Sequence, residues 1–131
     1  MTISKEHTEQ AAFIAWAAYQ TGTYPELARI FAIPNGGHRH KAVAGRMKAE
    51  GVRAGVPDLF LPVARGGYHG LWMELKIKPN KVSEAQADWL EWLEGQGYAV
   101  SVCYGFDELV STVEWYLELG AFDARLVEAK E

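Results

Sequence analysis

The sequence predicts an α/β domain of the mixed α+β kind, in which a small mixed β-sheet is flanked by helices. Two observations lead to this fold class. Segments with helical and strand-like apolar spacing follow one another in the order helix, strand, helix, strand, strand, helix, strand, helix. The 131 residues are 49% hydrophobic and 12% aromatic, which suffices for one core and leaves little room for a second. We therefore expect one domain over residues 1–120, followed by a mobile tail at 121–131.

The first third of the chain predicts two helices separated by a strand. The segment from Ser4 to Tyr19 has apolar residues at helical spacing, a serine at the N-cap and a glutamate in the first turn. After a short helical turn at Tyr24 to Ala28, the apolar segment from Arg29 to Ile33 predicts a strand that Pro34 ends. A second helix is predicted over His38 to Glu50, because a glycine follows it directly.

The rest of the domain follows from the same signals. Glycine, proline and asparagine separate short apolar runs, and a serine precedes the next helical pattern as an N-cap. The predicted elements are, in order, a strand at 58–63, a hairpin-like loop at 64–70, a strand at 71–78, a helix from Ser83 to Gln96, a strand at 98–104 and a helix at 106–119.

The net charge of −4 conceals an uneven distribution. From Pro34 to Lys81 there are nine Lys or Arg residues and three Asp or Glu, a local charge of +6. The remainder has four cations and fourteen anions, a charge of −10. A basic middle between acidic ends can present a positive face to nucleic-acid phosphates although the total is negative. The alternative is that these are ordinary solvated charges.

Two features bear on the compartment. The first ten residues are polar rather than signal-like, and no apolar run approaches the length of a bilayer span. We therefore expect a soluble, cytoplasmic protein with no membrane partner. The single cysteine, Cys103, excludes an intrachain disulfide and fits a reducing compartment. It lies in an apolar run, where a buried thiol is expected.

Charged residues occur inside two apolar strand-like runs. In the run LWMELKIK, strand alternation places Glu74 and Lys76 on one face, about 6.6 Å apart, and only apolar side chains on the other. The apolar face is expected to pack on the core. The charged face has two interpretations: a metal site beside a reacting group, or a half-exposed strand surface with an ordinary Glu–Lys pair.

Asp58 begins the preceding strand, and a short hairpin would bring its carboxylate close to Glu74. Two adjacent carboxylates repel each other unless a cation lies between them. Mg²⁺ or Mn²⁺ suits such oxygen ligands, and both ions often bind through one or two carboxylates plus substrate phosphate. The sequence contains no zinc-type spacing, because it has one cysteine and scattered or clustered histidines.

These segments resemble a known family. Pro57-Asp58 followed by Glu74-Leu75-Lys76 matches the PD-(D/E)XK signature of the restriction-endonuclease-like nucleases. The strings IPNGGHRHKAVAGRMKAEGVRAGVPDLFLPV, GLWMELK and SEAQADWLEWLEGQGYAVSVCYGFDE are similar to its VRR-NUC branch, found as stand-alone phage and bacterial proteins and as a module of larger repair nucleases. The resemblance spans about residues 6–117 and implies a restriction-endonuclease-like core.

The resemblance assigns roles to the residues that match its motifs. It implies metal binding by Asp58, Glu74 and the backbone carbonyl of Leu75. The family's first-helix glutamate falls on Glu6, with Glu9 as the competing position. The implied catalytic residues are Glu6, Asp58, Glu74, Lys76 and Gln86.

The implied reaction is phosphodiester hydrolysis with Mg²⁺ or Mn²⁺ as cofactor. A carboxylate-held cation neutralises the phosphate charge and lowers the pKa of a bound water. Lys76 would orient or deprotonate the attacking water, or stabilise the developing charge on the phosphate. Gln86 would position Lys76 or the nucleophile by hydrogen bonding, and Glu6 would hold a water or a second ion. One-metal and two-metal mechanisms both stay open.

Substrate contacts are expected from the basic segment that follows the first strand. Its glycines allow close approach of the backbone to a phosphate, and its cations supply the counter-charge. The alternative is a turn followed by a solvated helix. The expected substrate-binding residues are Asn35, Gly36, His38, Arg39, His40, Lys41 and Arg46.

Three functions are compatible with these residues. The resemblance favours a metal-dependent DNA endonuclease, and its stand-alone members resemble Holliday-junction resolvases that act on branched DNA as homodimers. A flap or 5′-overhang nuclease is the alternative within that class. The other two functions are a non-catalytic nucleic-acid-binding module, which would bind DNA in a salt-sensitive way without cleavage, and a structural or interaction subunit.

Overall fold

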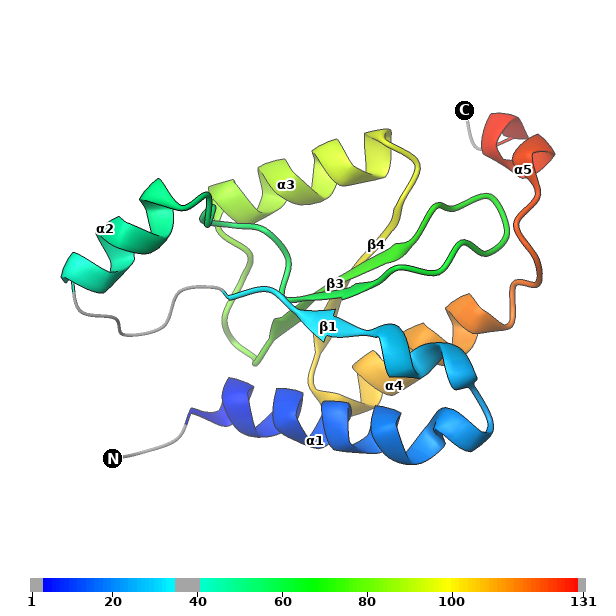
Figure 1. Ribbon diagram of the computed structural model, residues 1–131, viewed down its shortest axis with the longest axis horizontal. Coiled ribbons are helices and arrows are strands. Elements are labelled where there is room, and N and C mark those ends of the chain that lie inside the picture. Colours follow the sequence, from blue (N-terminus) through cyan, green and yellow to red (C-terminus); the bar gives the residue numbers. More distant parts are fainter. Residues whose placement is uncertain (1–3, 35–40, 130–131) are drawn as a thin grey trace.

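The structure, a computed structural model, describes residues 4–34 and 41–129. A four-stranded sheet lies at its centre, with α3 on one side and α1 and α4 on the other (Figure 1). The elements are α1 (Lys5–Tyr19), the 3-10 turns η1 (Gln20–Gly22) and η2 (Pro25–Arg29), β1 (Phe31–Ala32), α2 (Lys41–Ala49), β2 (Leu59–Leu61), β3 (Leu71–Lys76), α3 (Glu84–Gly95), β4 (Ala99–Tyr104), α4 (Phe106–Leu117) and α5 (Ala124–Ala129).

The sheet is mixed and has the strand order β1-β2-β3-β4. The pairs β1–β2 and β2–β3 are antiparallel, whereas β3 and β4 are parallel. A parallel neighbour requires a crossover connection, and α3 is that crossover, lying over one face of the sheet. The predicted fold class, a small mixed sheet flanked by helices, is confirmed.

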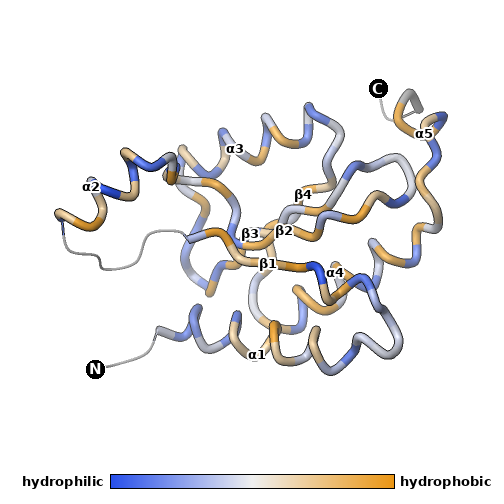
Figure 2. Tube along the Cα trace, viewed as in Figure 1, coloured by the Kyte–Doolittle hydropathy of each residue, from blue (hydrophilic) through white to orange (hydrophobic). Residues whose placement is uncertain are grey.

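The main core lies between the sheet and the helices α1 and α4. Strand alternation directs Leu71, Met73 and Leu75 of β3 to this side, and all three side chains are fully buried. They pack in one cluster with residues of the two helices, among them Phe13 and Tyr116. Hydrophobic segments accordingly gather along the strands in the middle of the molecule, as Figure 2 shows. Burial of these apolar side chains is the dominant favourable term of the fold.

The opposite face of the sheet is covered only in part. There α3 packs against β4 and buries Leu90 and Leu93, which do not join the main core cluster. On the same face Trp72 of β3 stacks on Phe60 of β2, with ring centroids 4.2 Å apart. Phe31 of β1 extends this aromatic row and is 47% exposed. One face of the sheet is therefore an apolar core, and the other combines aromatic and charged residues.

Several elements are shorter than the sequence predicted, because apolar runs continue beyond the hydrogen-bonded ladders. The strand predicted at 29–33 pairs only over β1, since residues 25–29 form the 3-10 turn η2. The strand predicted at 71–78 ends at Lys76. The helix predicted from His38 is described from Lys41 onward, because residues 35–40 lie outside the described residues.

The segment after Gly120, which we expected to be a mobile tail, is folded over residues 121–129. The amide of Asp123 donates to the carbonyl of Gly66, and the amide of Gly66 donates to the carbonyl of Gly120. A Cβ on Gly67 would lie 2.9 Å from the carbonyl carbon of Leu126 in α5, so glycine permits this close approach. The sequence alone did not reveal these backbone contacts. Through residues 4–34 and 41–129, no helix has the length and hydrophobicity to cross a membrane.

Candidate active site beyond the end of the β2–β3 ladder

The candidate site begins where the β2–β3 ladder ends. The last pair of the ladder is Leu59 and Met73. Antiparallel register therefore places the next residues, Asp58 and Glu74, opposite each other on one face of the sheet. Asp58 is 9% exposed and Glu74 is 1% exposed. The structure thus brings together the two carboxylates that the sequence predicted to be neighbours, and it buries both.

Asp58 is held by backbone groups on both sides. The amide of Leu75 donates to Asp58 Oδ2 at 2.7 Å, and the amide of Ile33 donates to the Asp58 carbonyl at 2.8 Å. The amide and carbonyl of one strand residue project toward the same edge of the strand. The carbonyl of Leu75 therefore faces the edge where Asp58 lies, which is the position that the predicted metal ligand requires.

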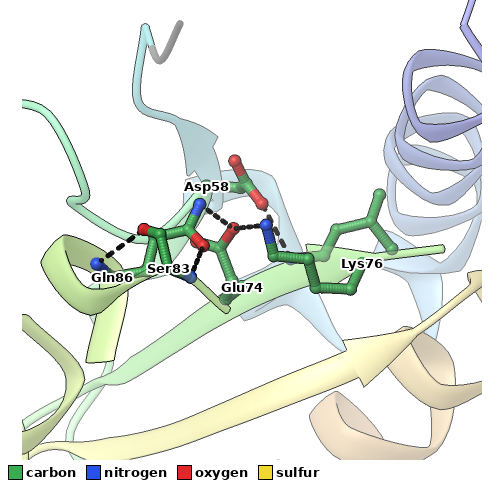
Figure 3. A network of polar contacts seen from close by, with 6 residues as sticks. Asp58, Glu74, Lys76, Ser83 and Gln86 are labelled. Carbon is green, nitrogen blue, oxygen red and sulfur yellow. Dashed lines mark hydrogen bonds and ion pairs between the residues drawn. The ribbon is translucent and has the colours of Figure 1, made fainter. Parts of the chain in front are cut away.

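The two oxygens of Glu74 have different surroundings (Figure 3). Oε2 accepts a hydrogen bond from Gln86 Nε2 at 3.0 Å and lies 3.8 Å from Lys76 Nζ. Oε1 is buried and has no hydrogen-bond partner within residues 4–34 and 41–129. Burial in the first place, and then the neighbouring Asp58 carboxylate, raise the pKa of Glu74 to about 8. Its ionised form therefore needs an additional positive charge at this point.

An ordinary surface pair does not describe Glu74 and Lys76. The Lys76 side chain is 12% exposed and that of Glu74 is 1% exposed, so Glu74 is buried and Lys76 is mostly removed from water. A half-exposed strand face, the alternative interpretation of the sequence, is wrong for this part of β3. One neighbour from another element is Gln86, in the first turn of α3, which contacts Glu74 (Figure 3). An ion pair that is removed from water in this way is costly to keep.

Of the two glutamates considered in the first helix, Glu6 interacts electrostatically with the charged residues of the site. Burial, followed by the charge of Asp58, raises the pKa of Glu6, and the charge of Lys76 lowers it. Glu9 lies elsewhere, because its Oε1 would be 3.4 Å from a Cβ placed on Gly105 at the start of α4. Glu6 is therefore the better candidate of the two.

Gln86, which we expected to position Lys76 or the nucleophile, contacts Glu74. Its Nε2 donates to Glu74 Oε2, while its Oε1 accepts from the amide of Ser83 at 2.9 Å. Ser83 in turn accepts from the amide of Gln86 through Oγ at 3.2 Å, which completes a capping box at the start of α3. We identified Ser83 only as an N-cap; the Ser-x-x-Gln spacing is the signal that links it to the site.

The turn before Asp58 touches the same first turn of α3. Gly55 has φ +91°, and a Cβ at this position would lie 2.8 Å from the carbonyl carbon of Ala85. A side chain is therefore excluded both by backbone conformation and by space. Through this contact, α3 is held against the segment that leads into Asp58 as well as against Glu74.

The basic segment is described only in part. The predicted substrate-binding residues Lys41 and Arg46 lie on α2 and are exposed, as are Lys48 and Arg53, which sequence reasoning did not single out. No residue of α2 is buried, and the helix stands apart from the sheet at the end where α1 and α3 begin (Figure 1). The remaining predicted contacts lie outside the described residues: Asn35, Gly36, His38, Arg39 and His40.

The donor set suits a hard divalent cation. Two carboxylates and a backbone carbonyl meet at one strand edge, and the carboxylate oxygen Oε1 of Glu74 is buried without a donor. Oxygen ligands of this kind are preferred by Mg²⁺ and Mn²⁺, which fill their other positions with water or substrate oxygens. Over the described chain, no group of three or more His, Cys, Asp or Glu side chains is arranged to hold a metal ion. Glu6 therefore does not complete a side-chain triad with Asp58 and Glu74.

Comparison with known proteins places the chain among nuclease domains. The model of the VRR-NUC domain family matches residues 2–107. A solved structure described as a VRR_NUC domain protein is 32% identical in sequence and similar in fold, with a TM-score of 0.79. That similarity covers 95% of this chain and 97% of the other. Among curated proteins, none matches the chain.

Proposed function

This chain belongs to the VRR-NUC family, a family of nucleases, and we propose that it is an Mg²⁺- or Mn²⁺-dependent DNA endonuclease that acts on branched DNA in the manner of a Holliday-junction resolvase. One observation carries the proposal. Asp58 and Glu74 face each other, both buried, and Glu74 Oε1 has no donor in the described part of the chain. Such a pair is stable in its ionised form only with a cation beside it.

The carboxylates and Leu75 form the proposed cation site. A bound divalent ion would neutralise the phosphate charge and favour formation of the attacking hydroxide. Asp58 is oriented toward it by the amide of Leu75, and Glu74 is oriented by Gln86. The carbonyl of Leu75 supplies a third oxygen. This arrangement is supported by the strand register and does not depend on a flexible loop.

Lys76 is the proposed charged partner of the reacting phosphate. Its ammonium group is held 3.8 Å from Glu74 Oε2, and the side chain reaches the surface to the extent of 12%. It can therefore donate to a phosphate oxygen or to the attacking water without moving far. Burial, followed by the charge of Asp58, raises the pKa of Glu6, and we propose that this side chain positions a water near the site.

The proposed path of the DNA backbone runs past α2. Lys41, Arg46, Lys48 and Arg53 are all exposed on or just after this helix, where Glu50 is the only carboxylate. The amide of Ile33 contacts the Asp58 carbonyl, so the chain passes beside the carboxylates shortly before its basic segment begins in the sequence. Cations in this position contact phosphates and set the register of the duplex, whereas they do not read sequence.

We propose that the active form is a homodimer that cuts branched DNA. Cutting two strands of a junction requires two active sites, and a two-fold axis relates them most simply. Light scattering of the protein alone and with a four-way junction measures this directly. A protein that stays monomeric in both conditions would favour the flap or 5′-overhang nuclease, which needs one site.

The function is tested by cleavage of labelled DNA. Purified protein is incubated with a four-way junction, a 5′ flap and a linear duplex, each with Mg²⁺, Mn²⁺ or EDTA. We expect junction cleavage with Mg²⁺ or Mn²⁺ and none with EDTA. Asp58→Ala should lower the rate by about 10³-fold or more, because a cation at the phosphate supplies several kcal/mol. Asp123→Ala, which alters a carboxylate paired with Arg125 at the other end of the molecule, is the matched control.

The same assay separates the competing functions. Cleavage that survives EDTA or Asp58→Ala would contradict the proposed mechanism. Binding of junction DNA without cleavage under all conditions would favour a non-catalytic nucleic-acid-binding module. Equal cleavage of junction and linear duplex would keep the nuclease and reject the branched substrate.

A further inference from the structure

At the capping box of α3, both the oxygen and the nitrogen of the Gln86 side-chain amide form hydrogen bonds. The Oε1 atom of Gln86 accepts from the amide of Ser83 at 2.9 Å, and Nε2 donates to Glu74 Oε2 at 3.0 Å. Ser83 Oγ accepts from the amide of Gln86 at 3.2 Å, so the backbone and the side chain of Gln86 are both anchored to Ser83. The start of a helix and a buried strand carboxylate thus share one side chain (Figure 3).

A capping box alone does not require glutamine at this position. Its third residue needs only a side-chain acceptor for the N-cap amide, and glutamate supplies one equally well. An ionised glutamate at position 86 would have no hydrogen-bond donor for Glu74, whereas glutamine has one. Because the amide of Ser83 occupies the oxygen of Gln86, the NH₂ group is the end that meets Glu74. The cap therefore sets which end of the amide the carboxylate receives.

As a consequence, the two carboxylate oxygens of Glu74 have different partners. Oε2 is held by Gln86 and lies near Lys76, whereas Oε1 is left buried with no donor from the described residues. If the amide rotated or moved away, the Glu74 carboxylate could turn and exchange the positions of its two oxygens. The first turn of α3 is itself fixed from the other side by Gly55, which lies against Ala85.

We propose that Ser83 is a positioning residue for the metal site: acting through Gln86, it holds Glu74 so that Oε1 is turned toward the cation. The inference rests on the proposed function, because it concerns the ion that the carboxylates are proposed to bind. Ser83 itself touches neither the ion nor the substrate. A purely structural N-cap would stabilise α3 and leave cation affinity unchanged.

The test is a double-mutant cycle on cation affinity, read by calorimetric titration of the full-length protein with Mn²⁺. We expect Ser83→Ala and Gln86→Met each to weaken Mn²⁺ binding by about tenfold or more, as is usual when the group that orients a metal ligand is removed. The double variant should bind no more weakly than Gln86→Met, because Ser83 acts through Gln86. Ser83→Thr, which keeps the cap hydroxyl, should restore the affinity.

Ala87→Gly is the matched control. It weakens α3 at an exposed position one residue beyond Gln86, by an amount comparable to the loss of a cap, and leaves the amide in place. We expect it to lower the melting temperature as Ser83→Ala does and to change Mn²⁺ affinity less than twofold. If Ser83→Ala does not fold, Ser83→Gly removes the same hydroxyl, and glycine costs a helix start little.

Additive losses in the cycle, or equal weakening by Ala87→Gly, would overturn the positioning role. A protein that cleaves DNA while Ser83→Ala retains full Mn²⁺ affinity would overturn this inference alone. A protein that binds Mn²⁺ with the expected cycle and cuts no DNA would contradict the proposed function and keep the inference. Absence of Mn²⁺ binding in the unsubstituted protein would overturn both.

Discussion

The two faces of β3 differ although they belong to the same six residues. One face presents Leu71, Met73 and Leu75 to a closed apolar core, where each side chain is fully buried. The other presents Glu74 and Lys76, also removed from water, beside a second carboxylate. Burial of the first face stabilises the fold, whereas burial of charge on the second opposes it. Residues of β3 that stabilise the fold by apolar burial thus alternate with residues whose burial as charged groups destabilises it.

The strongest test of this comparison is Glu74→Gln. The substitution preserves the volume of the side chain and removes the charge that burial makes unfavourable. We expect cleavage to fall by about 10³-fold or more, since a ligand of the proposed cation is lost. The melting temperature in EDTA at pH 8 should rise or stay unchanged. A variant that loses both activity and stability would show that Glu74 is needed for folding as well.

Met73→Ala tests the opposite face, one position away. Truncation of this fully buried side chain should lower the free energy of unfolding by about 2–5 kcal/mol, because it creates a cavity in the core. Urea denaturation measures the change. The cleavage rate per folded molecule should stay within a few-fold of the unsubstituted protein at a temperature where both are folded. A large loss of that rate would mean that the two faces are not independent.

The pH dependence of stability sharpens the comparison. The pKa of Glu74 is raised from 4.5 to about 8, so the folded protein holds a proton that the unfolded chain releases between these values. Stability in EDTA should therefore fall as the pH rises from about 5 through 8. We expect a decrease of several degrees in melting temperature, since 1 kcal/mol corresponds to roughly 2–8 °C in domains of this size.

Two controls accompany this pH series. In Glu74→Gln the dependence should become much flatter, and Mg²⁺ at pH 8.5 should raise the melting temperature of the unsubstituted protein, because an ion that binds only the folded state stabilises it. Glu6, whose pKa is also raised, contributes in the same direction and accounts for a residual slope. A melting temperature that increases from pH 6 to 8.5 would contradict the assignment.

The smallest expected effect concerns α2, which belongs to neither face. Lys48→Gln and Arg53→Gln should each weaken DNA binding by the catalytically inactive Asp58→Ala protein. The slope of log K against log salt concentration should decrease by about 1 for each lost phosphate contact. Lys5→Gln, an exposed cation at the start of α1, is a control for general charge effects. Unchanged slopes would mean that α2 is a solvated helix.

Much of this architecture was readable from spacing alone. Alternation in LWMELK predicted both faces of β3, and the order of elements predicted the mixed sheet. The opposition of Asp58 and Glu74 followed from the predicted hairpin, because a register shift of one residue would turn the charged face of β3 into the core. Sequence periodicity suffices for such features, because within a strand the direction of one side chain fixes the directions of the next.

Other features depend on contacts between distant segments. Glu74 is buried and contacts Gln86 of α3, and sequence spacing within β3 could not reveal this. For the same reason the contact of Gln86 with Glu74 was not predicted: the two residues lie twelve positions apart in the sequence, and the placement of α3 decides which neighbour Gln86 meets. The folding of the C-terminal segment depends on backbone contacts with Gly66 and Gly67, which leave no periodic pattern.

The position of α2 has a consequence for how the molecule can change. Because no side chain of this helix is buried, substitutions on it are nearly free of stability cost, whereas those on β3 are not. If α2 contacts nucleic acid as proposed, substitutions on it can alter that binding without disturbing the proposed site on β2 and β3. In protein engineering, α2 is therefore the element to vary, and β2 and β3 are the elements to keep unchanged.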